Sequence, residues 1–141
     1  MEVDLLEELK GEKPWQDELS FYEKYEDKVV IKHLYGPLFF GYTAHFKDQF
    51  ALLPAGTEAV ILRMDRVPLI DQSGLYALED SILSLRQRDI EVLFVGLQEQ
   101  PCDMLKSIDI IPDLVPEHDL FSNIDGAFDY LEEIKTKKEV V

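Results

Sequence analysis

The side chains best suited to chemistry lie in a short polar run, Asp71-Gln72-Ser73-Gly74, between two apolar stretches. Ser73 could act as a nucleophile there, but a serine needs a base positioned beside it. The Gly-x-Ser-x-Gly elbow of many serine hydrolases does not occur in the sequence. The candidate bases are His33, His45 and His118, and nothing in their spacing selects one of them. We therefore predict no catalytic residue and no enzyme activity.

The sequence gives metal and cofactor sites no better support. No two histidines share a short motif, and Cys102 is the only cysteine, so a zinc site has no recognisable ligand set. Neither a Walker-type loop nor Gly-x-Gly-x-x-Gly occurs. The net charge of −15 repels phosphate backbones and anionic lipid head groups. We expect no metal, no cofactor and no nucleic-acid partner.

The polar run also has a purely structural interpretation. It stands between an apolar run and a helical pattern, and the first N–H groups of a helix need oxygen acceptors. Either Asp71 or Ser73 could supply that oxygen, with Gly74 easing the turn. Ligands often bind where a parallel strand gives way to a helix, because free N–H groups converge there. A helix cap, a binding turn and a phosphorylation switch therefore all remain open at this point.

Two kinds of signal alternate along the chain from residue 28 and indicate βαβ units. Three short apolar or β-branched runs, VVIKHLY, EAVILRM and EVLFVGL, predict buried strands. Over residues 75–88, apolar residues recur at steps of three and four and predict a helix packed on the sheet by one stripe: Leu75, Leu78, Ile82 and Leu85. The predicted fold class is α/β, with helices covering a mainly parallel sheet.

Three further helices are expected, each with its own inward-facing residues. The first runs from Thr43 to Leu53, and the second follows Pro101. The last begins at a cap supplied by Ser122 or Asn123. The inward sets are Phe46, Phe50 and Leu53 for the first, Met104, Leu105 and Ile108 for the second, and Ile124, Phe128, Leu131 and Ile134 for the last.

The 141 residues are interpreted as one domain, residues 28–141, preceded by an acidic and aromatic leader or linker, residues 1–27. In the leader, Trp15, Leu19, Tyr22 and Tyr25 have roughly helical spacing, which predicts a short helix docked on the domain. No apolar run approaches the roughly 18 residues that cross a bilayer, so no direct membrane insertion is expected. The single cysteine favours a cytoplasmic location.

Four stretches, taken together and in order, resemble the STAS domains attached to SulP-type sulfate and anion transporters. They are VPLIDQSGLYALE at residues 67–79, YGPLFFG at 35–41, VLFVGLQ at 92–98 followed by Gln100-Pro101, and HDLF at 118–121. The resemblance covers about residues 28 to 134. It implies a small mixed, mostly parallel sheet packed with about four helices, and a domain that binds rather than catalyses.

The resemblance implies a cytoplasmic regulatory domain at the inner face of the membrane, with residues 1–27 joining it to the last membrane helix. Its partner would be the transmembrane portion of the transporter, another STAS domain or a regulatory protein. The alternative is a stand-alone partner-switching protein similar to anti-sigma factor antagonists, in which a kinase modifies the residue after the turn's aspartate. That residue is Gln72 here, which has no hydroxyl group.

The resemblance and the residue pattern together give two candidate surfaces. The first is the interaction turn, made of Asp71, Gln72, Ser73, Gly74 and Tyr76. The second is the segment that contains Gly36, Pro37, Phe39 and Phe40, in which neighbouring phenylalanines of an extended chain would point to opposite faces.

Overall fold

The computed structural model describes residues 15–19, 28–36, 48, 50 and 52–140, the side chains of 136–140 excepted. Its four strands lie in the order β1-β2-β3-β4, and every pairing between them is parallel. The three predicted strand runs all form strands. The strands are β1 (Val29–Tyr35), β2 (Ala59–Arg66), β3 (Glu91–Val95) and β4 (Leu120–Phe121). An antiparallel strand, which a mixed sheet would add, is not among the pairings of the described residues.

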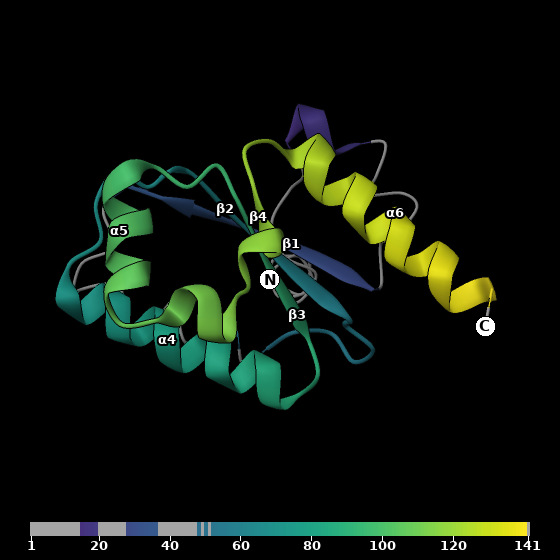
Figure 1. Ribbon diagram of the computed structural model, residues 1–141, viewed down its shortest axis with the longest axis horizontal. Coiled ribbons are helices and arrows are strands. Elements are labelled where there is room, and N and C mark those ends of the chain that lie inside the picture. Colours follow the sequence, from purple (N-terminus) through teal and green to yellow (C-terminus); the bar gives the residue numbers. More distant parts are fainter. Residues whose placement is uncertain (1–14, 20–27, 37–47, 49, 51, 141) are drawn as a thin grey trace, which may run out of the picture.

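Helices cover both faces of this sheet, as Figure 1 shows. On one face lie α4 (Gln72–Gln87) and α5 (Glu99–Ser107), and on the other lies α6 (Ile124–Val140). Successive strand residues point to opposite faces of the sheet. Because helices cover both faces, the strand residues on each face must be apolar. In β2, Val60 and Leu62 pack toward α4 and α5, whereas Ala59 and Ile61 pack toward α6. The predicted α/β class is confirmed.

The predicted stripe of α4 is confirmed, since Leu75, Leu78, Ile82 and Leu85 are all buried. The helix begins at Gln72, three residues before the predicted start. In α5, Leu105 is buried while Met104 and Ile108 are partly buried against the same core. This helix begins at Glu99 instead of after Pro101, because proline is tolerated in a first turn whose N–H groups have no helical acceptor.

Asn123 supplies the acceptor at the start of α6, where its Oδ1 accepts the N–H of Gly126 at 3.0 Å. Along α6, Ile124, Phe128 and Leu131 are buried as predicted, and Ile134 is partly buried. The expected helix from Thr43 to Leu53 falls mainly outside the described residues. Its Phe50 and Leu53 are buried, and Phe46 lies in the part that is not described.

Three short helical turns complete the described elements: η1 (Gln16–Glu18), η3 (Ile110–Leu114) and η4 (Glu117–Asp119). The turn η1 precedes the sheet in the chain, while η3 and η4 connect α5 to β4. Among the described helices, none combines the length and the apolar character needed to cross a bilayer.

Candidate functional site

Asp71 caps α4, which decides between the two capping residues that the sequence allows. Its backbone is extended (φ −87°, ψ 176°), and its Oδ1 accepts the N–H of Gly74 at 2.7 Å. Gly74 is buried inside the first turn of α4, so the bend before the helix does not depend on it. Since Asp71 already supplies the capping oxygen, Ser73 is not needed as the cap.

The outward side of this turn carries polar and aromatic groups. Gln72 and Tyr76 are four residues apart on α4, and Gln72 Nε2 lies 3.5 Å from the Tyr76 hydroxyl. Tyr76 is 48% exposed, and Leu69, in the preceding loop, is 46% exposed. Asp71 and Ser73 are only half-buried. The structure therefore presents Gln72, Tyr76 and Leu69 to solvent and uses Gly74 for packing.

The loop before the turn is fixed by glutamines that follow β3. The Gln100 side chain accepts the N–H of Ile70 at 2.9 Å and donates to the Ile70 carbonyl at 3.0 Å. Gln98 Nε2 donates to the Asp65 carbonyl at 3.0 Å. These bonds join the chain segment that follows β2 to the segment that follows β3. The loop before the turn is therefore held in place by the residues after β3.

Of the second candidate surface, the structure describes only Gly36. It follows β1 with φ +66°, a value that suits glycine, and its N–H donates to the Arg66 carbonyl at 2.9 Å. Pro37, Phe39 and Phe40 lie outside the described residues. Gly36 and the Asp71 turn both follow the carboxyl ends of parallel strands, so both belong to the same edge of the sheet.

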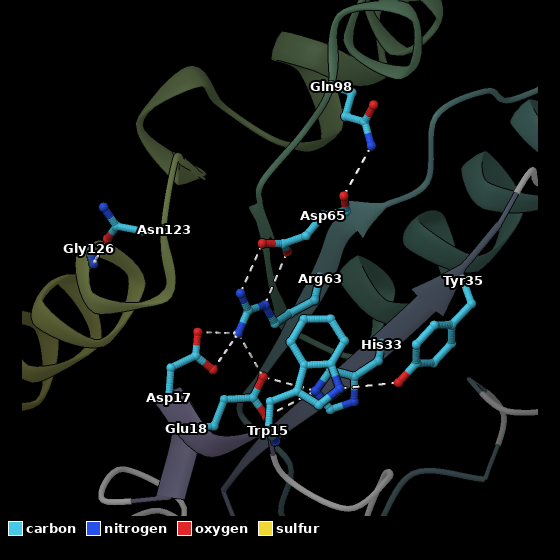
Figure 2. Close-up of polar contacts among 10 residues, drawn as sticks. All are labelled: Trp15, Asp17, Glu18, His33, Tyr35, Arg63, Asp65, Gln98, Asn123 and Gly126. Atoms are coloured by element: carbon cyan, nitrogen blue, oxygen red, sulfur yellow. Dashed lines mark hydrogen bonds and ion pairs between the residues drawn. The ribbon is translucent and has the colours of Figure 1, made fainter.

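An ionic network centred on the buried side chains of Glu18, His33 and Arg63, which was not predicted from the sequence, lies on the α6 side of the sheet. We call it the Arg63 cluster, and it consists of Asp17, Glu18, His33, Arg63 and Asp65 (Figure 2). Arg63, 4% exposed, donates from Nε and Nη2 to Asp65 at 3.1 and 2.9 Å. Its Nη1 donates to Asp17 at 2.8 Å and to Glu18 at 3.0 Å. The guanidinium group is thus held by three carboxylates, and its pKa is raised because these bonds outweigh its burial.

Glu18 is fully buried, yet it carries its charge. Burial alone would raise its pKa, but hydrogen bonds from His33, the Trp15 N–H and Arg63 lower the pKa overall. His33 Nε2 lies 2.9 Å from both Glu18 oxygens, and the Trp15 N–H donates to the same carboxylate at 3.0 Å. Since an ionised carboxylate only accepts hydrogen bonds, His33 Nε2 must be the donor.

Trp15 covers this network. Its ring stacks on His33 with centroids 4.4 Å apart, and the guanidinium carbons of Arg63 and Arg66 each lie 4.4 Å from its centroid. Its Nε1 donates to the Tyr35 hydroxyl at 3.1 Å. The leader segment Trp15–Glu18 thus contacts the domain, but it does so as the three-residue turn η1 and through Trp15 and two carboxylates. Leu19 is 52% exposed, and Tyr22 and Tyr25 lie outside the described residues.

Gly96 lies directly against the Asp65 carboxylate. It has φ +73°, and a Cβ added to it would lie 2.6 Å from Asp65 Cγ. Any larger residue would therefore displace the carboxylate that holds Arg63.

The Arg63 cluster had one sequence signal. In β2 the polar residues Arg63 and Asp65 alternate with Leu62 and Met64, so they share a face, and His33 lies beside Arg63 in register. That alternation within an apolar strand could have indicated a polar patch. Nothing local distinguishes Glu18 from the other acidic residues of the leader.

Two neighbouring carboxyl groups, Glu91 of β3 and Asp119 just before β4, lie on the α6 side of the sheet. Asp119 is 2% exposed. Its pKa is raised to about 7 because it is buried and because the Glu91 carboxylate lies beside it. Tyr130 donates to Glu91 Oε2 at 2.6 Å, and its own pKa is raised by burial and by this bond. His118 Nε2 lies 3.4 Å from Asp119 Oδ1.

The site chemistry is that of ion pairs and hydrogen bonds. Among the described residues, no group of three or more histidine, cysteine or acidic side chains is placed to hold a metal ion. Of the three candidate bases, His33 is engaged with Glu18, His118 lies against Asp119, and His45 falls outside the described residues.

Comparison with known proteins agrees with this fold. The STAS domain family matches residues 23–127. A sulfate transporter family protein from Wolinella succinogenes is 30% identical with a TM-score of 0.69, covering 77% of this chain and 88% of that one. A SulP transporter STAS domain from Vibrio cholerae is 29% identical with a TM-score of 0.66, covering 77% and 85%.

A more distant neighbour is murine solute carrier 26 family member A9, an anion transporter in the inward-facing state. It is 17% identical with a TM-score of 0.66, covering 79% of this chain and 20% of that one, and it supports the fold alone. No curated protein matched the chain significantly. The family match, the parallel sheet between two helix layers and the capped turn after β2 together show that this chain belongs to the STAS domain family.

Proposed function

We propose that this chain is the non-catalytic regulatory and interaction domain of a SulP-type sulfate or anion transporter, at the cytoplasmic face of the membrane. Its similarity to a sulfate transporter family protein and to a SulP transporter STAS domain supports this proposal. In this proposal, residues 1–27 join the domain, residues 28–141, to a preceding membrane portion. The partner is that membrane portion, a sister STAS domain or a regulatory protein.

The observation that carries the proposal is the outward side of the Asp71 turn. Gln72 and Tyr76 lie off the stripe by which α4 packs on the sheet, and Tyr76 is 48% exposed. Leu69, in the loop before them, adds exposed apolar area at 46%. Aromatic and apolar side chains on a rigid helix start are suited to a protein contact. We therefore assign the docking surface to Leu69, Gln72 and Tyr76, at the start of α4.

Docking of this kind regulates a transporter only if the contact differs between two of its states. A domain that bound both states equally would shift nothing, however tightly it bound. The rigid attachment of the turn by Gln100 and Asp71 supports such a role, because movement of the domain then moves the contact as one body.

The partner-switching alternative has less support. The residue after Asp71 is Gln72, an exposed residue at the start of α4 that has no hydroxyl group to phosphorylate. Ser73 does carry a hydroxyl, but it lies one position further along the helix and is half-buried. We therefore place the function with the transporter branch of the family.

The proposal is tested by introducing positive charge on the docking surface. Gln72→Lys combined with Tyr76→Lys should reduce uptake of labelled sulfate or other anion by the intact transporter that carries this domain. The unfolding temperature of the domain should hardly change, because both side chains are outside the core.

The matched control is Ser84→Lys with Gln87→Lys, which adds the same charge at exposed positions near the other end of α4. This pair should leave uptake unchanged. Equal uptake by wild type and the Gln72/Tyr76 variant, with both folded, would show that the docking surface lies elsewhere.

A further inference from the structure

The segment Trp15–Glu18 contacts the sheet as a bound peptide would. It comes from outside the strands, and its contacts reach 15 residues along the chain to His33 and 45 to Arg63. It brings one indole ring and two carboxylates, and both carboxylates bind the Nη1 group of Arg63. Figure 2 shows these groups converging where β1 and β2 end.

The strand side of this contact is built for such a ligand. His33 and Tyr35 come from β1, and Arg63 and Arg66 come from β2. Asp65 occupies Nε and Nη2 of Arg63, which leaves Nη1 directed at the incoming carboxylates. Arg66 lies over the indole, so the strand side of the contact carries two positive guanidinium groups and one negative carboxylate, that of Asp65. This local positive charge stands in a chain whose net charge is −15.

The indole is recognised separately from the carboxylates. It stacks on His33, lies 4.4 Å from each guanidinium carbon, and donates from Nε1 to Tyr35. Stacking, cation–π contact and a hydrogen bond at one ring are the combination expected for a tryptophan site. Glu18 is fully buried in the contact, whereas the Asp17 side chain is half exposed.

We propose that the carboxyl ends of β1 and β2 form a binding site for short peptides that combine a tryptophan with neighbouring carboxylates, and that Trp15–Glu18 is such a peptide bound in cis. An acidic, tryptophan-bearing segment of a partner would compete for the site. Its binding would release the chain segment that enters the domain. This site is separate from the docking surface on α4, so the two can be tested independently.

The affinity of a separate peptide for this site can be estimated from the short connection between Trp15–Glu18 and the domain. Residues 20–27 join the segment to the residues before β1, and a short tether gives an effective concentration on the order of 1 mM. For the segment to be mostly bound in cis, the free peptide must bind with a Kd below about 1 mM. In the wild-type chain the tethered segment competes for the site, so the apparent Kd of an added peptide should rise by roughly 1 mM, which is a weakening of about tenfold if the free Kd is about 0.1 mM.

The test uses the full chain with its own segment disabled by Trp15→Ala, Asp17→Asn and Glu18→Gln, here called the opened chain. A fluorescein-labelled peptide of residues 15–19 (WQDEL) is titrated with each protein and followed by anisotropy. The opened chain should bind it with a Kd below about 1 mM. Adding Arg63→Gln to the opened chain should weaken binding at least about tenfold, and so should changing the peptide to WQNQL.

Equal binding to the wild-type and opened chains would overturn the proposal. Binding that survives Arg63→Gln would also overturn it, as would no binding in the millimolar range to an opened chain that circular dichroism shows to be folded. If the opened chain does not fold, the single variant Trp15→Phe replaces it. That variant has no tryptophan, because Trp15 is the only one in the chain, so the indole emission of the unlabelled peptide reports binding directly.

Discussion

The Arg63 cluster depends on Gly96, because there is no space for a side chain at this position beside Asp65. Its φ of +73° is costly for other residues, and an added Cβ would lie 2.6 Å from Asp65 Cγ. Gly96→Ala should therefore lower the free energy of unfolding by on the order of 2–4 kcal/mol, measured by urea denaturation.

Gly36→Ala is the matched control for that prediction. Gly36 has a similar φ of +66° but no atom of the described residues within 4 Å of the added Cβ, so it reports the backbone cost alone, about 1–2 kcal/mol. The difference between the two variants measures the displacement of Asp65. Equal losses in both would mean that Asp65 does not depend on Gly96.

Asp119 makes the stability of the fold depend on pH. Its pKa in the folded protein is raised to about 7, above the ordinary value of 3.8, so the folded state binds more protons than the unfolded state between these values. The free energy of unfolding must then fall as pH rises from about 4 to about 7. Asp119→Asn, which cannot ionise, should be close to wild type at pH 4 and more stable by on the order of 1–3 kcal/mol at pH 8.

Thermal unfolding followed at both pH values checks this. Asp103→Asn, which removes an exposed carboxylate on α5, serves as the control for the loss of one negative charge. If Asp119→Asn destabilises the protein equally at pH 4 and pH 8, the carboxyl group is not protonated in the folded state.

At the scale of elements, the start of α4 depends on Asp71. Asp71→Ala removes the oxygen that accepts the Gly74 N–H at 2.7 Å and should cost about 0.5–2 kcal/mol in the free energy of unfolding. Ser73→Ala should cost only a few tenths of a kcal/mol, because another residue already caps the helix. A larger loss for Ser73→Ala than for Asp71→Ala would reverse the assignment of the cap.

The elements themselves could be predicted from the sequence because their signals are local. The stripe Leu75, Leu78, Ile82 and Leu85 repeats at helical spacing, and all four residues are buried. The sequence pattern predicts too late a start for α5, because proline often marks a helix boundary although the first helical turn accommodates it. Exposure of Gln72 and Tyr76 also followed from that periodicity.

The Arg63 cluster could not be predicted in the same way. Glu18 and Arg63 are 45 residues apart, and their pairing depends on how the leader crosses the ends of β1 and β2. Only the alternation in β2 pointed to a polar patch, and it did not identify the partner. Contacts set by the tertiary path of the chain leave no periodic signal.

At the scale of the whole molecule, both of the proposed interaction surfaces lie at one edge of the parallel sheet. All its strands end at the same edge, so the chain leaving β2 becomes the Asp71 turn, and the ends of β1 and β2 receive the leader. Two helix layers fix this edge from both faces (Figure 1). The domain can therefore present the α4 surface to a partner while the leader is held on the α6 side.

The central claim, that the domain acts by docking through the start of α4, is tested most directly by site-specific photo-crosslinking. A benzophenone amino acid is placed at Tyr76 of the domain within the purified intact transporter, and at Gln87, exposed at the other end of α4, as the control. We predict a crosslink from position 76 to the membrane portion, a sister domain or a bound regulator, with little from position 87. Crosslinks from position 87 but not from position 76, or none from either in an active transporter, would contradict the claim.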